Sequence, residues 1–215
     1  MAEAASRAAA LELRTYTFLD RMQPQYAAFI GTVVNGDIPI AGMAQLFIEV
    51  APGNAIFRVA DIALKSADVR PGVQIVEREF GVLEIHSASL QAVRAAGEAV
   101  LTELGLEESS RIKPTVVSSQ IITNVDPYQA QLINKFRRGA MLVPGETMLV
   151  LETSPAAYVS LAANEAEKAA QINVVNVNNI GRFGRMFLSG DTSHIQMARD
   201  AAVAAVNAVS GREGR

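Results

Sequence analysis

The chain repeats itself at a constant offset of 103 residues, and no gap is needed to align the two copies. The shift carries Glu49 onto Glu152 and Pro52 onto Pro155. Further matched pairs are Pro24 and Pro127, Ile30 and Ile133, Gly36 and Gly139, Gly42 and Gly145, Phe80 and Phe183, and Gly81 and Gly184. A period this long exceeds the roughly 20 to 50 residues of solenoid units, so each copy is expected to be a whole small domain.

We predict two domains, at residues 11–112 and 113–215, preceded by an N-terminal extension at residues 1–10. A chain of 215 residues, half of them hydrophobic (50%), is long enough to build two packed cores. Residues 105–113 (GLEESSRIK) are mostly polar and are expected to form the linker between them.

Both copies predict the same order of elements: strand, helix, strand, helix, hairpin, helix. Alternation over residues 13–19 and 116–122 is typical of strands. The next helices begin at Pro24 and Pro127, because proline is favoured at the first helical position, and are expected to run to Gly36 and Gly139. The other predicted elements are strands at 46–50 and 148–151, helices at 56–67 and 159–170, hairpins over 73–85 and 172–188, and helices at 90–104 and 195–209. Each copy is therefore predicted to be an α/β fold, an α+β sandwich with a mostly antiparallel sheet.

Composition argues against several classes of protein. The net charge is −3 and the basic residues are scattered, so we expect neither nucleic acid nor an anionic membrane as a partner. There is no cysteine, which excludes disulfides and thiol chemistry. No stretch approaches 18 charge-free apolar residues, and the first residues lack the apolar core of a signal peptide. The expectation is a soluble cytoplasmic protein.

Residues that could carry catalysis are few. His86 and His194 are the only histidines and occupy unrelated positions in the repeat, and both are expected near the start of a helix. The glycines of GRFG, Gly181 and Gly184, lack a full dinucleotide fingerprint and are expected in a hairpin turn. No metal cluster, paired carboxylates or activated nucleophile is evident, so we expect no cofactor, no metal and no enzymatic activity.

Two segments carry a resemblance to a known family. IEVAPGNAIFRVADIALKSADVRPGVQIVEREFGVLEIHS (48–87) and LETSPAAYVSLAANEAEKAAQINVVNV (151–177) resemble the two halves of tandem-domain bacterial microcompartment shell proteins. The similarity is to the circularly permuted, trimer-forming kind found in carboxysomes and some other microcompartments, and it extends over residues 11–209. It implies a homotrimer that forms a flat pseudohexameric tile, often stacked face to face with a second tile around a chamber.

The resemblance also implies a central pore gated by a Glu-Arg pair, which here falls on Glu77 and Arg78. We expect this pair at the tip of a hairpin on the threefold axis, with Glu79 and Phe80 behind it and Gly81 allowing the chain to turn back into its strand. The second copy reads Ile-Gly-Arg at residues 180–182, so only one loop of each pair can be the charged gate. Without the resemblance, a solvated hairpin turn would be the simpler interpretation of residues 77–79.

Lys65 and Lys168 occupy matched positions and resemble the lysine that shell domains place at tile edges; the alternative is a solvated cation at a helix end. The predicted function is a structural shell protein with a pore for small charged metabolites and with neighbouring shell proteins as partners. An oligomeric regulatory protein that binds a small molecule is the main alternative, and a small enzyme of ferredoxin-like fold is a third. The sequence leaves carboxysome or another microcompartment open.

Overall fold

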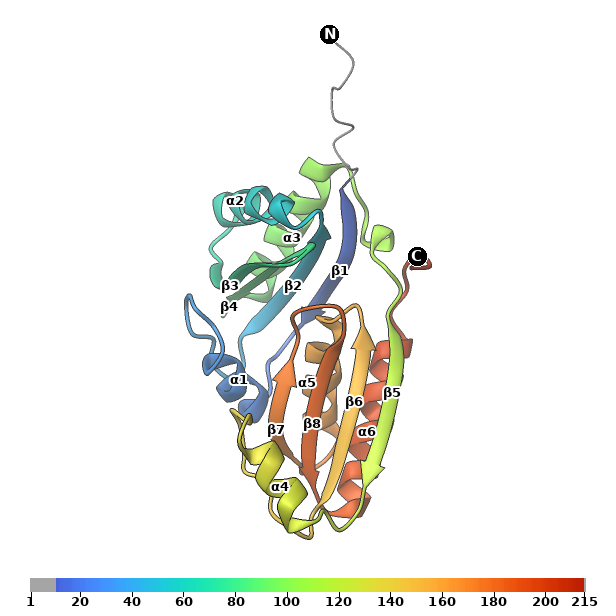
Figure 1. Ribbon diagram of the computed structural model, residues 1–215. Helices are drawn as coiled ribbons and strands as arrows, with labels where there is room; N and C mark the ends of the chain where they lie inside the picture. Colours follow the sequence, from blue (N-terminus) through green and yellow to red (C-terminus); the bar gives the residue numbers. More distant parts are fainter. Residues whose placement is uncertain (1–10, 215) are drawn as a thin grey trace.

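The computed structural model describes residues 11–214 and contains two similar α/β units (Figure 1). The first contains β1 (Glu12–Leu19), α1 (Pro24–Gly31), β2 (Ala44–Ala51), η1 (Gly53–Ala55), α2 (Ile56–Ser66), β3 (Arg70–Glu77), β4 (Phe80–Ser87) and α3 (Leu90–Leu104). The connection contains η2 (Glu108–Ser110). The second contains β5 (Thr115–Ile122), α4 (Pro127–Asn134), β6 (Thr147–Ser154), α5 (Tyr158–Ala169), β7 (Asn173–Asn178), β8 (Gly184–Gly190) and α6 (Thr192–Asn207).

The predicted order of elements is confirmed, and so is the duplication. Shifted by 103 residues, β1, α1 and β2 have the same bounds as β5, α4 and β6. Each unit holds one four-stranded antiparallel sheet, in the orders β1-β2-β4-β3 and β5-β6-β8-β7. Residues 1–10, where an extension was predicted, lie outside the described residues.

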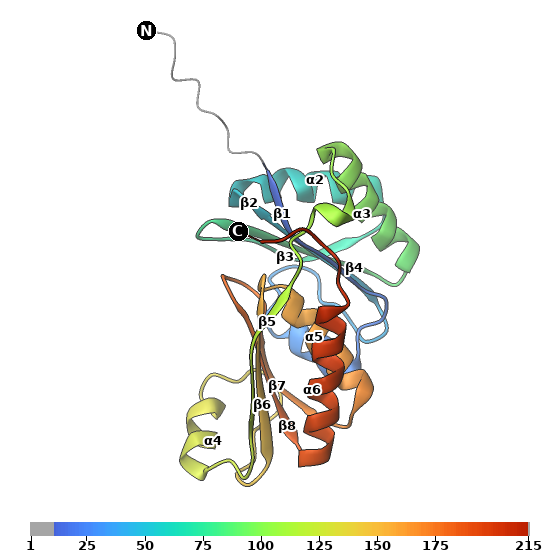
Figure 2. The same ribbon diagram turned by 90° about the vertical axis from the view of Figure 1, so that its right-hand side faces the viewer.

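A pair of helices covers one face of each sheet. In Figure 2, α5 and α6 lie on one side of the second sheet and α4 on the other; α2 and α3 pair in the same way over the first sheet. The covering helices are rich in alanine on the buried side, including Ala60, Ala63, Ala163 and Ala166. These small side chains let the helices approach the sheet and each other closely.

Helix α1 keeps a buried hydrogen bond to its own sheet, from the Tyr26 hydroxyl to Gln45 of β2, and packs against the second unit. Its residues Tyr26, Phe29 and Ile30 share a hydrophobic core with Val159 of α5 and Val174 of β7. Figure 1 shows α1 beside this unit, whereas its counterpart α4 lies at the far end of the molecule. The two units are therefore joined by a shared core as well as by the linker.

The first helix of each copy is shorter than predicted, because α1 ends at Gly31 and α4 at Asn134. In the first copy, the backbone N–H groups of Asn35 and Gly36 both donate to the Gly72 carbonyl, and that of Asp37 donates to Pro71. These bonds to β3 draw the chain off the helical path before Gly36. The prediction that the glycines close the helices was wrong.

Candidate functional site

The charged hairpin joins β3 to β4. Glu77 pairs with Phe80 across the ladder, so Arg78 and Glu79 are the two residues of the turn. This corrects the predicted arrangement, in which Glu77 shared the tip and Glu79 lay behind it. Arg78 is 91% exposed, and its Nε lies 3.6 Å from Oε1 of Glu77, a contact that solvent weakens. The tip therefore presents opposite charges to solvent.

Arg78 also has an unusual backbone. Its φ of 55° lies in the left-handed region, which a residue with a Cβ adopts at a cost. Glycine or asparagine would fit this position more easily. Gly81 does not make the turn, contrary to the prediction. It lies inside β4, paired with Val50 of β2 and Val76 of β3, and a Cβ there would collide with the Gly53 carbonyl and lie 2.6 Å from the Ile56 Cβ. It is needed for close packing.

Phe80 anchors the base of the hairpin, as predicted. Its side chain is buried, and the guanidinium carbon of Arg14 lies 3.7 Å from the ring centroid, in cation–π geometry. Arg14 Nε donates to Oε1 of Glu49 over 2.6 Å, and a second acid, Glu12, lies 3.8 Å away. The exposed tip thus rises from a base that buried charges hold in place.

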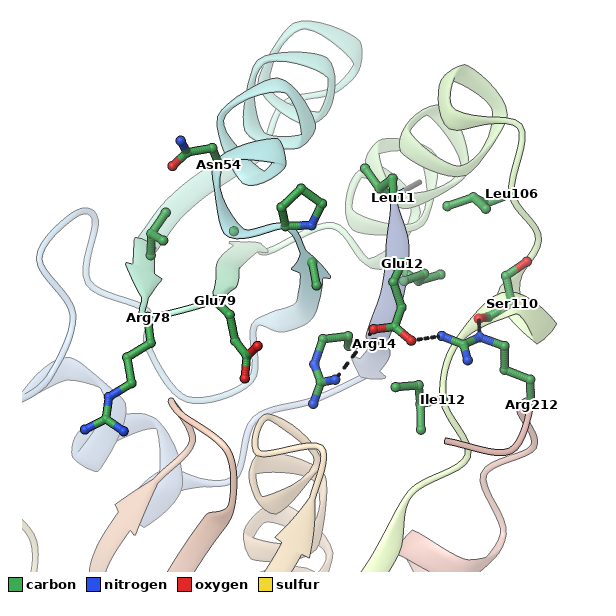
Figure 3. Close-up of a pocket in the computed structure, with 15 residues that line it drawn as sticks. Leu11, Glu12, Arg14, Asn54, Arg78, Glu79, Leu106, Ser110, Ile112 and Arg212 are labelled. Carbon is green, nitrogen blue, oxygen red and sulfur yellow. Dashed lines mark hydrogen bonds and ion pairs between the residues drawn. The ribbon is translucent and has the colours of Figure 1, made fainter. Parts of the chain in front are cut away.

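A cavity of about 1060 Å³ opens beside the hairpin. Figure 3 shows Arg78 and Glu79 at one wall, Arg14 and Glu12 on β1 facing them, and Arg212 at the opposite wall. Arg212 is held by Glu12, 2.6 Å from its Nη2, and by the Ser110 carbonyl, 3.0 Å from its Nε. The cavity can therefore offer both arginines and carboxylates to a charged molecule.

The second copy departs from this arrangement at its hairpin. Residues 179–183 connect β7 to β8, with Gly181 at a φ of 110°. This agrees with the predicted hairpin turn for Gly181. Gly184, which was predicted in the same turn, is instead the first residue of β8 and pairs with Thr153 of β6. Asn179 is buried and donates to Ser160 Oγ over 3.0 Å, while Phe183, the counterpart of Phe80, is exposed. Only the first hairpin combines a charged tip with an anchored base.

The Arg14–Glu49 pair was missed at the sequence level. Glu49 lies in the apolar run of β2 and is fully buried, and burial raises the pKa of its carboxyl although Arg14 opposes that shift. Its counterpart Glu152 instead pairs with Arg185 at the surface. A glutamate within a predicted buried strand was the available signal, because such a charge requires a partner.

His86 was predicted near a helix start and lies instead in β4, fully buried. Its Nδ1 is 3.0 Å from Oε1 of Glu84, and its Nε2 is 3.2 Å from Oδ1 of Asp37. Glu84 also accepts from Gln45 and from the Gly72 backbone. Burial disfavours the imidazolium, but Glu84 and then Asp37 outweigh it and raise the pKa of His86. The strand predicted at residues 82–85 continues two residues further, to Ser87, because the carboxylates of Glu84 and Asp37 compensate the charge of His86 inside the sheet. His194 lies in the first turn of α6, as predicted.

The matched lysines have different surroundings. Lys65 is exposed and lies 2.7 Å from Asp61, one turn earlier on α2. Lys168 Nζ contacts Glu165 on its own helix at 2.7 Å and Asp20 of the first unit at 3.2 Å, and these hydrogen bonds raise its pKa against the opposing effect of burial. Lys168 therefore lies where the two units meet, while Lys65 faces solvent.

Residues 11–214 contain no helix that is long and apolar enough to cross a membrane. Within the same range, no group of histidine, aspartate and glutamate side chains has the arrangement of a metal site. The charged hairpin and its cavity are the candidate functional site, because they bring Arg14, Arg78 and Arg212 next to two carboxylates.

Comparison with known proteins covers both copies. A family model described as the CsoS1D N-terminal domain matches residues 13–110, and one described as the BMC domain matches residues 149–212. The chain is 56% identical to the carboxysome shell protein CcmP of Synechococcus elongatus, over 94% of this chain and 95% of that one. It is 43% identical to the carboxysome shell protein CsoS1D of Hydrogenovibrio crunogenus, over 94% and 99% of the two chains.

Two solved structures superpose on most of the chain. The fused permuted hexameric shell protein of the RMM microcompartment superposes with a TM-score of 0.89 at 44% identity, over 93% of this chain and all (100%) of that one. The double ringed trimeric shell protein of the same microcompartment gives 0.90 at 39% identity, over 95% and 100%. The chain therefore belongs to the family of tandem, permuted BMC-domain shell proteins that includes CcmP and CsoS1D.

Proposed function

We propose that the protein is a structural shell protein of a bacterial microcompartment, a carboxysome or a related organelle, and has no catalytic role. Three chains form a pseudohexameric tile, and the hairpins around Glu77, Arg78 and Glu79 meet at its centre as a gated pore. One observation carries the proposal. Of the two copies in this chain, only the first has an exposed, charged hairpin tip whose arginine, Arg78, has a left-handed backbone conformation. A trimer has one such hairpin from each chain, so three of them can meet at its threefold axis.

The trimer follows from the duplication and from closed symmetry. Two similar units per chain, repeated by a threefold axis, approximate a sixfold object that can tile a plane. The solved relatives described as hexameric and as double ringed and trimeric support this arrangement. The latter description also supports two tiles stacked into a dimer of trimers.

The gate works through charge. When three hairpins meet, like charges at the axis repel, and at about 4 Å each contact costs roughly 1 kcal/mol in water and more in drier surroundings. Pairing Arg78 with an acid, either Glu77 or Glu79, relieves this repulsion and closes the hole. Because Arg78 is largely exposed in the single chain and its contact with Glu77 is long, swinging it aside requires little energy. Phe80 and Gly81 stay fixed at the base of the hairpin.

The cargo is a small charged metabolite. The cavity beside the hairpin is lined by arginines from three segments, Arg14, Arg78 and Arg212, together with two carboxylates. Arginine forks bind carboxylates and phosphates in bidentate geometry. A phosphorylated or carboxylated molecule passing the gate would meet this cavity next.

Lys65 and Lys168 contact neighbouring shell proteins at the tile edge. The exposure of Lys65, and the position of both residues in the last turn of their helices, support this role. Lys168 is also bound within the chain by Asp20 and Glu165, so of the two lysines Lys65 is the freer to reach a neighbour.

Assembly tests the proposal. Light scattering at micromolar concentration is expected to give the mass of a trimer or of two stacked trimers, and electron microscopy is expected to show extended sheets. A clean monomer would refute the shell role. Saturable binding of a small effector by trimers that never tile would instead favour the regulatory alternative.

A further inference from the structure

His86 bridges two carboxylates that come from different parts of the first unit. Its Nδ1 lies 3.0 Å from Oε1 of Glu84 on the same strand, and its Nε2 lies 3.2 Å from Oδ1 of Asp37, in the segment between α1 and β2. The His86 side chain is only 1% exposed, so solvent does not replace either contact. A neutral imidazole has one N–H, and only the imidazolium has two. Only the protonated ring can therefore donate to both carboxylates at once.

The two carboxylates differ in what else holds them. Glu84 is fully buried, and its oxygens also accept from Gln45 Nε2 and from the Gly72 N–H, each over 2.9 Å. The Asp37 side chain is 38% exposed, and its other charged partner is the exposed Arg70 at 3.4 Å. Loss of a hydrogen bond costs most for a group that water cannot reach. When the ring loses one proton, the remaining N–H is therefore expected on Nδ1, with Glu84.

Loss of that proton turns the contact with Asp37 from attraction to repulsion. Nε2 of the neutral ring and Oδ1 of Asp37 are both acceptors, so a lone pair faces a carboxylate. The charge balance changes as well. With a protonated ring, His86 and Arg70 offset Glu84 and Asp37; with a neutral ring, one negative charge is left without compensation. Asp37 can respond because water reaches it.

The other neighbours of the ring are neutral near physiological pH. Gln45 of β2 and Arg70 of β3 lie on either side of His86 in the sheet. Gln45 Oε1 accepts from the Tyr26 hydroxyl of α1 over 2.9 Å, and burial raises the pKa of Tyr26 far above this range. Apart from the permanently charged Arg70 and the two carboxylates, His86 therefore faces groups that do not titrate here.

Asp37 anchors the start of a loop with an apolar surface. The loop, residues 37–41, carries Ile38 (63% exposed) and Ile40 (61%). Its far end is held by a backbone hydrogen bond to the segment before α1. Its near end is held by one backbone bond from Asp37 to β3, over 2.9 Å, and by the side-chain contacts of Asp37. Release of that side chain would therefore loosen the near end of the loop.

The second copy has the same backbone frame without the titratable groups. Its loop is joined to β7 by hydrogen bonds from the N–H groups of Gly139 and Ala140, which match bonds of the first copy. The counterparts of Asp37, Gln45, Arg70, Glu84 and His86 are Ala140, Met148, Asn173, Phe187 and Ser189. None of these five side chains changes charge with pH. The network therefore occurs once per chain, and the second loop is an internal reference.

We propose that His86 is a pH-sensitive latch for the loop at residues 37–41. The protonated ring holds Asp37 and the loop against the sheet; as the pH rises and Nε2 loses its proton, Asp37 turns to solvent and the loop loosens in the first copy only. The raised pKa of His86 places this change on the alkaline side of the ordinary value of about 6.5. Because every group involved lies within one chain, the latch is independent of the proposed trimer and pore.

Nitrogen NMR of the labelled full chain tests the protonation step. Between about pH 6 and pH 9, a range that extends above the ordinary histidine value, His86 should lose the proton on Nε2 and keep the one on Nδ1. His194, at the surface of α6, is the reference for an imidazole without buried carboxylates. A His86 ring that loses the Nδ1 proton first, or that stays doubly protonated throughout, would overturn the proposal.

Hydrogen exchange measures the loop itself. Amide protection, corrected for the intrinsic effect of pH, is compared at residues 35–37 and at the matched Gly139 and Ala140 over the same range. In the wild type, protection in the first copy should fall about tenfold relative to the second, the usual effect of losing one charge-assisted hydrogen bond. Equal changes in both copies would contradict the latch.

Asp37→Asn is the matched variant. An amide side chain has both an acceptor oxygen and a donor N–H, so it can bond to Nε2 with or without the proton. Its loop should keep its protection over the whole range, whereas Asp37→Ala should give low protection at every pH. Both changes are at a partly exposed position and are expected to fold as the wild type does. A loop that loosens with pH in Asp37→Asn as much as in the wild type would overturn the proposal.

Discussion

Arg78 combines an exposed side chain with a left-handed backbone at the tip of the charged hairpin. We expect Arg78→Ala to leave folding and trimer formation nearly unchanged, because exposed charges contribute roughly 0–1 kcal/mol to stability. The pore should widen, and its remaining glutamates should repel anions. The flux of neutral molecules across assembled shells should therefore rise, and the ratio of anion flux to neutral flux should fall. Crystal structures of the variant together with flux assays measure both effects. Hairpins at the outer rim of the tile would contradict the gate.

His86 makes stability depend on pH. Its pKa is raised in the folded protein by Glu84 and Asp37, and Arg70 contacts Asp37 from the other side at 3.4 Å. The folded state therefore holds the proton more tightly than the unfolded chain, whose histidine titrates near 6.5. This stabilisation is complete below that pH and is lost as the pH rises through the folded pKa.

Urea unfolding at a series of pH values checks this expectation. The free energy of unfolding of the wild type should fall as the pH rises above about 6.5. His86→Gln should be less stable than wild type at low pH and should show a flatter profile in this window. His194→Gln serves as the control, since its position at the α6 surface lacks the buried carboxylates. Parallel profiles for wild type and His86→Gln would contradict the role given to this network.

At the scale of elements, α1 depends on a side chain from the other unit. Its N-cap position, Gln23, supplies no side-chain cap, and Glu167 satisfies two of its N–H groups instead. We expect Glu167→Ala to lower the free energy of unfolding by about 1–2 kcal/mol, the usual range for a lost cap. Glu167→Gln should lose less, because its amide oxygen still accepts one bond.

The matched control for α1 is Asp126→Ala, which removes the local cap of α4. It should cost a similar amount without disturbing the contact between units. Hydrogen exchange distinguishes the two variants: Glu167→Ala should expose amides in both α1 and α5, and Asp126→Ala only those of α4. Loss of protection confined to α1 in the first variant would mean that the junction does not couple the units.

At the scale of the whole molecule, the tile edge can be tested through Lys65. Lys65→Glu is expected to leave trimers intact, since its pair with Asp61 is exposed, and to suppress extended sheets by placing like charges across each seam. In the double variant, Lys65→Glu is combined with Lys168→Gln. A glutamate at position 168 would instead face Asp20 and Glu165 where the two units meet, and would repel them. Electron microscopy of sheets and light scattering of trimers separate the two effects. If the double variant forms sheets as the wild type does, the lysines do not act at the tile edge and are solvated cations instead.

The sequence alone determined the duplication, the order of the elements and their antiparallel sheets. These features follow from local patterns: a strict 103-residue offset, proline at helix starts and alternation in strands. It also located the charged hairpin and predicted that Phe80 would pack. Sequence patterns predicted the structure correctly where the structure depends on neighbouring residues, because such predictions do not require the contacts between distant segments.

The tertiary structure decided which of two equivalent positions, one in each copy of the repeat, is buried. The sequence does not show that α1 packs on the second unit whereas α4 has no such partner within the chain. It therefore could not predict that α1 covers Asn164 and Glu167 while their counterparts Asp61 and Leu64 remain exposed. His86 and Glu49 were misplaced or missed for the same reason, since the partners that make their burial possible, Asp37 and Arg14, come from other segments. Burial of a charge depends on contacts distant in sequence, and those exist only once the two units have packed together.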